Sequence, residues 1–163
     1  MTIVDEAEVL QRNDLFSAID PGKLKLLAFS SEKLRFAPGE SVFRREEPGS
    51  AGFLILEGQA ELVIETPCGR KAFSRHGKGE LLGMISMLVD VPRSGTCVAV
   101  SDLTVLCIAR ECYMHLMTAY PKLAIATTQV LAHRLNDLLL LLQDSALETA
   151  VHARAVGCRA GSG

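Results

Sequence analysis

Evenly spaced turn signals occupy the middle of the chain and restrict what it can fold into. Between residues 34 and 109, the glycines at 39, 49, 58, 69 and 79 stand 9 to 11 residues apart. Short apolar runs rich in β-branched residues stand between or after these turns, at 41–44, 53–56, 60–64, 96–100 and 104–108. Regular turns that separate short strands are typical of an antiparallel sandwich or barrel. We therefore expect the central region to form an antiparallel β-roll.

Helical patterns precede this β-rich region. Apolar residues lie at helical spacing in the first part of the chain, at Val9, Leu10, Phe16 and Ile19. A second short helix is expected over 21–29, because Asp20 suits the capping position and Pro21 suits the first helical position. Three leucines of that helix are expected to be buried: Leu24, Leu26 and Leu27.

A helical pattern also follows the β-rich region. One short helix is expected over 111–120, and Pro121 opens a longer helix that reaches residue 150. Its leucines repeat at spacings of 4, 3 and 4, which predicts a coiled-coil-like seam and a homodimer formed through Leu131, Leu135, Leu138 and Leu142. We expect a single domain over 1–150, including this dimerisation helix (about 121–150), and a flexible tail over 151–163.

Composition excludes several classes of protein. The net charge of −2, from 17 basic and 19 acidic residues, argues against a nucleic-acid-binding surface. The five cysteines form no CxxC pair, and none of the four histidines pairs with a cysteine at zinc-site spacing, so no metal site and no disulfide framework is expected. Free thiols favour a cytoplasmic location, and no apolar run approaches the ~20 residues of a membrane span. No catalytic residues and no cofactor are predicted.

The segment over 79–96 contains the candidate ligand-binding residues. We expect a short helix at 82–88, with Gly83 at its start and the backbone N–H groups of Ile85 and Ser86 free at its N-terminal end. Arg93 follows shortly after this helix, so that its guanidinium can donate two hydrogen bonds to the same anion. Ser94 adds a hydroxyl. Inside a β-roll, these groups would make a compact phosphate pocket.

In this order and spacing, the chain resembles the cyclic-nucleotide-binding domain family, the module of the catabolite activator and of the protein kinase A regulatory subunits. The resemblance covers roughly residues 10–140 and rests on the segments at 13–16, 37–40, 53–58 and 79–96. It implies an α+β fold: a jelly-roll-like β-roll (a double-stranded β-helix) with N-terminal helices, a short cassette helix and a long C-terminal helix. It also implies that the cassette helix and Arg93 hold the cyclic phosphate of cAMP or cGMP.

The sequence departs from the family pattern at one site position. The family has a glutamate after the cassette glycine, which accepts a hydrogen bond from the ribose 2′-hydroxyl, and this chain has Met84. A thioether is a poor acceptor, and a lost hydrogen bond to a charged group costs roughly 1.5–3 kcal/mol, or roughly 10- to 150-fold in affinity. The nearby Glu80 would substitute only if the loop shifted by four residues. Met84 can instead fill core space.

Three functional hypotheses follow. The first is a stand-alone cyclic-nucleotide-binding regulatory domain. Its ligand repositions the C-terminal helix, and a protein partner recognises that helix. The second is a degenerate domain that has lost nucleotide binding and acts as a dimerisation or partner-docking module. The third is a redox sensor that uses the cysteines. No nucleophile, base and orienting group stand at a plausible spacing, so an enzyme is not predicted.

Overall fold

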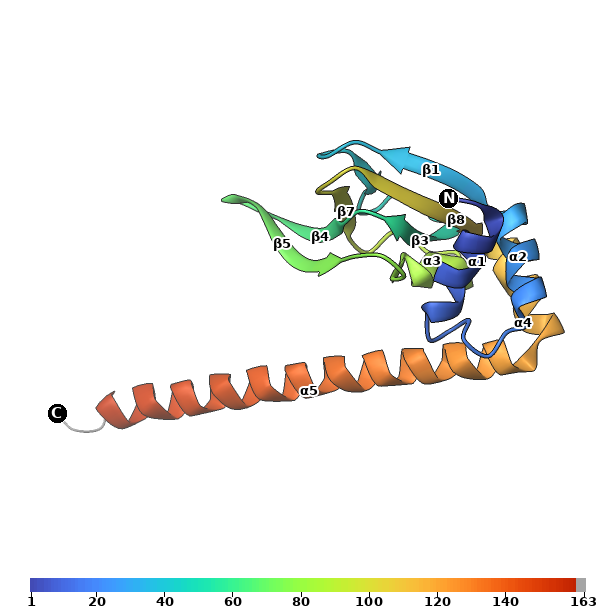
Figure 1. Cartoon of the computed structure of the whole chain (residues 1–163). Helices are drawn as coiled ribbons and strands as arrows, with labels where there is room; N and C mark the ends of the chain where they lie inside the picture. Colours follow the sequence, from blue (N-terminus) through green and yellow to red (C-terminus); the bar gives the residue numbers. More distant parts are fainter. Residues whose placement is uncertain (161–163) are drawn as a thin grey trace. The chain divides into compact units, whose positions relative to one another are not determined.

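The computed structural model describes residues 1–160, with side chains to residue 155, and contains two antiparallel sheets and five helices (Figure 1). In chain order the elements are α1 (Ile3–Arg12), α2 (Pro21–Ser30), β1 (Glu32–Phe36), β2 (Ser41–Phe43), β3 (Ala51–Glu57), β4 (Ala60–Thr66), β5 (Gly69–His76), β6 (Leu81–Leu82), α3 (Met84–Leu88), β7 (Thr96–Ala99), β8 (Leu103–Ala109), α4 (Arg110–Ala119) and α5 (Pro121–Ala160).

The two sheets form the expected β-roll. One sheet has the strand order β1-β8-β3-β6 and the other β2-β7-β4-β5, and every paired neighbour is antiparallel. The five expected strands are present as β2, β3, β4, β7 and β8. The strands β1, β5 and β6 were not predicted, because β1 and β5 are mostly exposed and rich in charged residues and β6 has only two residues.

The interior of the roll is an apolar cluster to which both sheets contribute. Phe53 and Ile55 come from β3, and Val105 comes from β8, all at alternate positions that face inward. Phe43 of β2 stacks on Phe53 with ring centroids 5.9 Å apart. Some interior-facing side chains are only half-buried, namely Leu34, Phe36, Val42, Leu62 and Cys107.

The first two helices form where the sequence predicts them. Thr2 caps α1 through a reciprocal capping box with Asp5, and Asp20 caps α2 by accepting a hydrogen bond from the Gly22 N–H at 2.7 Å. The expected apolar positions are buried: Val9, Leu10, Phe16 and Ile19. In α2 the prediction for Leu26 was wrong, since this side chain is 62% exposed while Leu24 and Leu27 are buried. Leu26 lies roughly 160° around the helix from Leu24, on the opposite face.

The C-terminal helices differ from the expected boundaries. The helix α4 begins one residue early, at Arg110, and α5 begins at Pro121 as predicted. Residues 151–160, which were expected to form a flexible tail, continue α5, and residues 161–163 lie outside the described part of the chain. The chain divides into two compact units, Met1–Ala124 and Ile125–Gly163. A single domain over 1–150 stays a prediction. None of the described helices is long and apolar enough to cross a membrane.

The two neighbouring leucines of α2 give a matched test of this packing. Leu27→Ala is expected to lower the free energy of unfolding by about 2–5 kcal/mol, because it empties a site that is buried. Leu26→Ala makes the same chemical change on the exposed face and is expected to change it by less than about 0.5 kcal/mol. Urea titration of both variants measures the difference, and equal losses would contradict the placement of this helix.

Candidate functional site

The side chain of Arg93 points into the β-roll. It is 7% exposed, and its guanidinium carbon lies 4.6 Å from the ring centroid of Phe43 and 5.4 Å from that of Phe53. The two stacked rings therefore provide a π surface for a desolvated cation. Arg93 thus lies inside the roll, and its role as a phosphate ligand stays a prediction. No sequence pattern indicated that Phe43 and Phe53 are its partners.

Carbonyl groups satisfy part of the guanidinium. Arg93 donates from Nη2 to the Ala51 carbonyl at 2.8 Å and from Nη1 to the Gly83 carbonyl at 3.4 Å. No carboxylate of the described residues lies within 4.0 Å of it. Burial lowers the pKa of Arg93 from its usual value, because the interior of the roll disfavours the charged form. A guanidinium has five N–H donors, so this one can still bind an anion.

Gly83 brings the start of α3 against this guanidinium. It has a left-handed backbone, with φ of +70°, and occupies the capping position of the five-residue helix. A Cβ atom at this position would lie 2.5 Å from Nη1 of Arg93. A glycine is therefore required here by both the backbone conformation and the close approach of Arg93. This arrangement places the first N–H groups of α3, which have no acceptor within the helix, near the cation.

A second arginine holds the cassette helix from its other end. Arg110, the first residue of α4, donates from Nε to the Ser86 carbonyl at 2.9 Å and from Nη2 to the Gly49 carbonyl. Carbonyls near a helix C-terminus lack partners within the helix and attract cations, so Arg110 caps α3. Its role was missed because the sequence pattern around it gives no signal of a contact 24 residues away.

The loop before β3 is paired with the segment that carries Arg93. The backbone N–H of Glu46 donates to the Arg93 carbonyl, and the N–H of Arg93 donates to the Glu47 carbonyl, both at 2.8 Å. A bridge between Pro48 and Pro92 extends this pairing. The position of Arg93 is thus fixed by its backbone as well as by its side chain.

The six predicted site residues differ in their contacts and in their exposure to solvent. Gly83 and Arg93 lie in contact, while Met84 and Ser86 are buried, Ile85 is half exposed and the Ser94 side chain is exposed. For Ile85 and Ser86, the predicted contact is through the backbone N–H, which does not depend on side-chain burial. Ligand binding by these six residues stays a prediction.

The ribose position contains no acceptor of the expected kind. Met84 is 2% exposed, so its side chain fills core space. The carboxylate of Glu80 accepts a hydrogen bond from the Gly77 N–H at 2.5 Å, and its other oxygen lies 3.2 Å from Nδ1 of His76. Glu80 therefore holds its own turn in this conformation and does not substitute for a glutamate at position 84.

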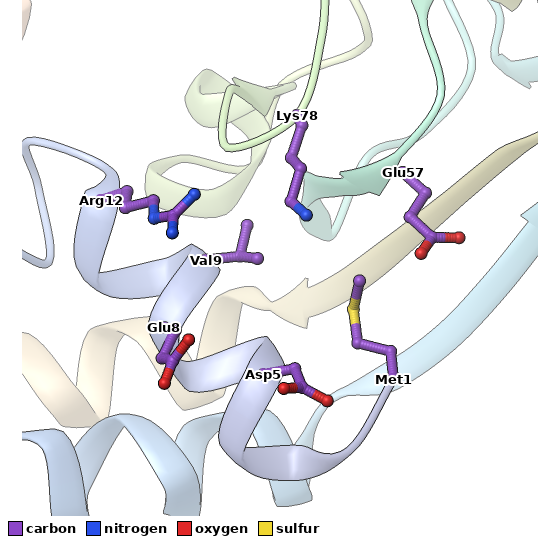
Figure 2. Close-up of a pocket in the computed structure, with 7 residues that line it drawn as sticks. All are labelled: Met1, Asp5, Glu8, Val9, Arg12, Glu57 and Lys78. Carbon is purple, nitrogen blue, oxygen red and sulfur yellow. The ribbon is translucent and has the colours of Figure 1, made fainter.

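A separate hollow lies between α1 and the turn at Lys78 (Figure 2). Its volume is about 280 Å³, and it is lined by Met1, Asp5, Glu8, Val9, Arg12, Glu57 and Lys78. None of these residues belongs to the cassette, and acidic and basic groups are mixed around it. This hollow does not have the single-sign charge that would select an ion.

Comparison with known proteins identifies the family. The family model "Cyclic nucleotide-binding domain" matches residues 33–120, more than half of the chain. The chain belongs to this family. The match confirms the resemblance of the sequence segments, and this cyclic nucleotide-binding domain has the β-roll that the resemblance implied.

Relatives include bacterial regulators and eukaryotic kinase subunits. The chain is 29% identical over 129 residues to the "Cyclic AMP receptor protein" of Thermus thermophilus, covering 78% of this chain and 60% of the relative. It is 23% identical over 110 residues to a "cAMP-dependent protein kinase regulatory subunit" of Colletotrichum orbiculare, covering 68% of this chain and 28% of the relative. It spans less than two thirds of the length of each of these curated relatives.

Solved structures resemble this domain at a similar level. The catabolite activator protein of Thermus thermophilus superposes with a TM-score of 0.75 at 28% identity, covering 82% of this chain and 63% of that one. The N-terminal domain of a transcriptional regulator from Streptomyces coelicolor superposes with a TM-score of 0.68 at 28% identity, covering 79% and 91%. Both carry the domain as part of a protein described as a regulator or an activator.

Two glycines with left-handed backbones test the contact between Gly83 and Arg93. Gly79→Ala is expected to cost about 1–2 kcal/mol, the strain of a left-handed alanine, because its Cβ would meet nothing within 4 Å. Gly83→Ala adds a clash with Nη1 of Arg93 and is expected to cost about 2–5 kcal/mol. Denaturant unfolding of both variants gives the two values. Equal costs would mean that Arg93 does not occupy the space beside Gly83.

Two thiols in the roll have environments that suppress their reactivity. Burial raises the pKa of Cys97 to about 12, with partial compensation by Arg93, and burial also raises the pKa of Cys107. The thiolate is the reactive form, so these side chains are protonated and inert at neutral pH. This environment argues against the redox hypothesis for both residues.

Thiol titration checks this conclusion. When a disulfide reagent is added at pH 8, the exposed Cys68 is expected to react rapidly. Cys97 is expected to react only after the protein unfolds. The variant Cys68→Ser should lose one equivalent from the fast phase, and Cys97→Ser should leave the fast phase unchanged. If Cys97→Ser lost one equivalent of thiol from the fast phase, this result would contradict the conclusion that Cys97 is inert and would support the redox hypothesis.

Proposed function

We propose that this domain is a regulatory module that binds cAMP or cGMP through Gly83, Met84, Ile85, Ser86, Arg93 and Ser94, and that the protein itself catalyses no reaction. One observation carries the proposal: a buried guanidinium, with no carboxylate partner among the described residues, lies beside the start of a short helix inside the β-roll. A cyclic phosphate carries one negative charge and accepts several hydrogen bonds. It therefore matches both the fork of Arg93 and the N–H groups of α3.

The affinity should be low because the ribose half of the site lacks its acceptor. Met84 is buried and Glu80 is held by its own turn, so the 2′-hydroxyl would lose a hydrogen bond to a charged group. Such a loss corresponds to roughly 10- to 150-fold in affinity. Half-buried apolar side chains on the interior face, such as Leu62 and Phe36, offer surface to a purine.

Signalling would pass through the C-terminal helix. Leu135, Leu138 and Leu142 are each more than half exposed, which supports a homodimer in which this seam, with Leu131, is covered by a second copy. The ligand would shift the population of cassette conformations, and a protein partner would read the helix that follows. No nucleic acid and no cofactor enters this scheme, and the cytoplasm is the compartment we expect for it.

A second candidate function is a partner-docking or dimerisation module that has lost nucleotide binding. The observation that favours it is the burial of Met84, because a side chain that fills core space is a stable replacement for an acidic ligand-binding residue. In that case Arg93 would act only as a structural cation held by two carbonyls and two rings. The two functions differ in what nucleotide titration shows.

Calorimetry with cAMP and cGMP separates them. The wild type is expected to bind at least one of the two weakly, Arg93→Met to show no binding, and Met84→Glu to bind about 10- to 150-fold more tightly. Methionine retains aliphatic volume beside Phe43 and Phe53, so the fold should persist in Arg93→Met. Circular dichroism of each variant verifies this.

Arg75→Met is the matched control, since Arg75 is an exposed arginine of β5. It should bind like the wild type. If the wild type and Met84→Glu both give no heat at millimolar nucleotide, the sensing function is excluded and the docking function remains.

A further inference from the structure

The helix α5 carries a second apolar stripe, distinct from the leucine seam. At about 100° per residue, Leu140, Leu147 and Val151 lie roughly 120–160° around the helix from Leu135. Each of the three side chains is more than half exposed. A two-stranded coiled coil covers one stripe of each helix, so a second copy on the seam leaves this stripe uncovered.

All the acidic side chains over 125–155 lie on one flank of this second stripe. They are Asp137, Asp144 and Glu148, and they repeat at the same spacings of 7 and 4 as the apolar residues, each three positions earlier. All three are exposed. The two arginines in this range, Arg134 and Arg154, stand roughly 60–100° away from the centre of that acidic row. The surface is therefore an apolar row with an acidic border.

A shallow depression marks the C-terminal part of this surface. It is lined by Leu147, Glu148, Val151, His152 and Ala155, all from α5. Apolar and acidic groups are thus adjacent there, as in a surface that takes up an apolar side chain beside a cation.

We propose that the stripe Leu140–Leu147–Val151 and its acidic border bind a basic amphipathic helix of a protein partner. The apolar residues of such a helix would cover the stripe, and its lysines or arginines would pair with Asp137, Asp144 and Glu148. This proposal does not depend on nucleotide binding. It gives the partner of the C-terminal helix a defined chemistry.

The charges argue against a second copy as the occupant. In an antiparallel pair of helices each flank faces the same flank of its partner, so the acidic row of Asp137, Asp144 and Glu148 would face its own counterpart. In a parallel pair the acidic row would face the opposite flank, where Arg154 is a single cation for three carboxylates. Like charges at this distance are destabilising. A basic partner converts the same border into a favourable contact.

A synthetic peptide tests the proposal on the full chain. The probe is an amphipathic helix with leucines at spacings of seven and four residues and lysines along one flank, and a scrambled peptide of equal composition is its control. Fluorescence anisotropy is expected to give binding that weakens as salt increases. Leu147→Gln should weaken it by about tenfold or more, and Asp144→Asn by about two- to fivefold, because an exposed ion pair contributes less than a covered leucine.

Ile125→Gln is the matched control variant, because it makes the same kind of change at an exposed apolar residue of α5 that lies outside the seam and roughly 22 Å along the helix from Leu140. It should leave peptide binding unchanged, and all of these residues are exposed, so each variant should keep the helical content of the wild type. Equal binding of the scrambled peptide, or no binding of the designed one, would overturn the proposal. It would also be overturned if sedimentation showed that Leu147→Gln separates copies of the chain and Leu135→Gln does not.

Discussion

The arrangement of the functional region depends on one buried cation. In the part of the chain that the structure describes, Arg93 has no carboxylate partner and is held inside the β-roll by two backbone carbonyls and two aromatic rings. Transferring a charge from water to an apolar interior is costly unless dipoles compensate for it, and these four contacts provide that compensation. The close approach of the same guanidinium means that a Cβ atom at position 83 would clash with it. Backbone hydrogen bonds to the loop before β3 hold the segment that carries Arg93.

The cassette helix illustrates how local structure here depends on tertiary contacts. Five residues form too few hydrogen bonds to make a helix stable on its own. In this domain α3 begins at a glycine beside one arginine and ends against another, and Arg110 joins it to both α4 and the loop at Gly49. Tertiary contacts therefore stabilise this helix. Contacts made at either end bear directly on its geometry.

Sequence patterns predicted those features that have local causes. Regular glycines and apolar runs predicted five strands that contribute to the apolar interior, β2, β3, β4, β7 and β8. Of the two capping residues, Asp20 was predicted and Thr2 was not. The strand β5 was missed because its charged residues face solvent, and Leu26 was assigned to the wrong face of α2. Arg110, Phe43 and Phe53 join the site only through folding, so no spacing in the chain revealed them.

The buried guanidinium of Arg93 also has a consequence for selectivity. Its field extends through a medium of low polarity, where water screens charge poorly. A neutral nucleoside with the same base and sugar as a cyclic nucleotide would leave that field uncompensated, and a polyamine would be repelled by it. The site would therefore select molecules by their charge first and by the identity of their base second.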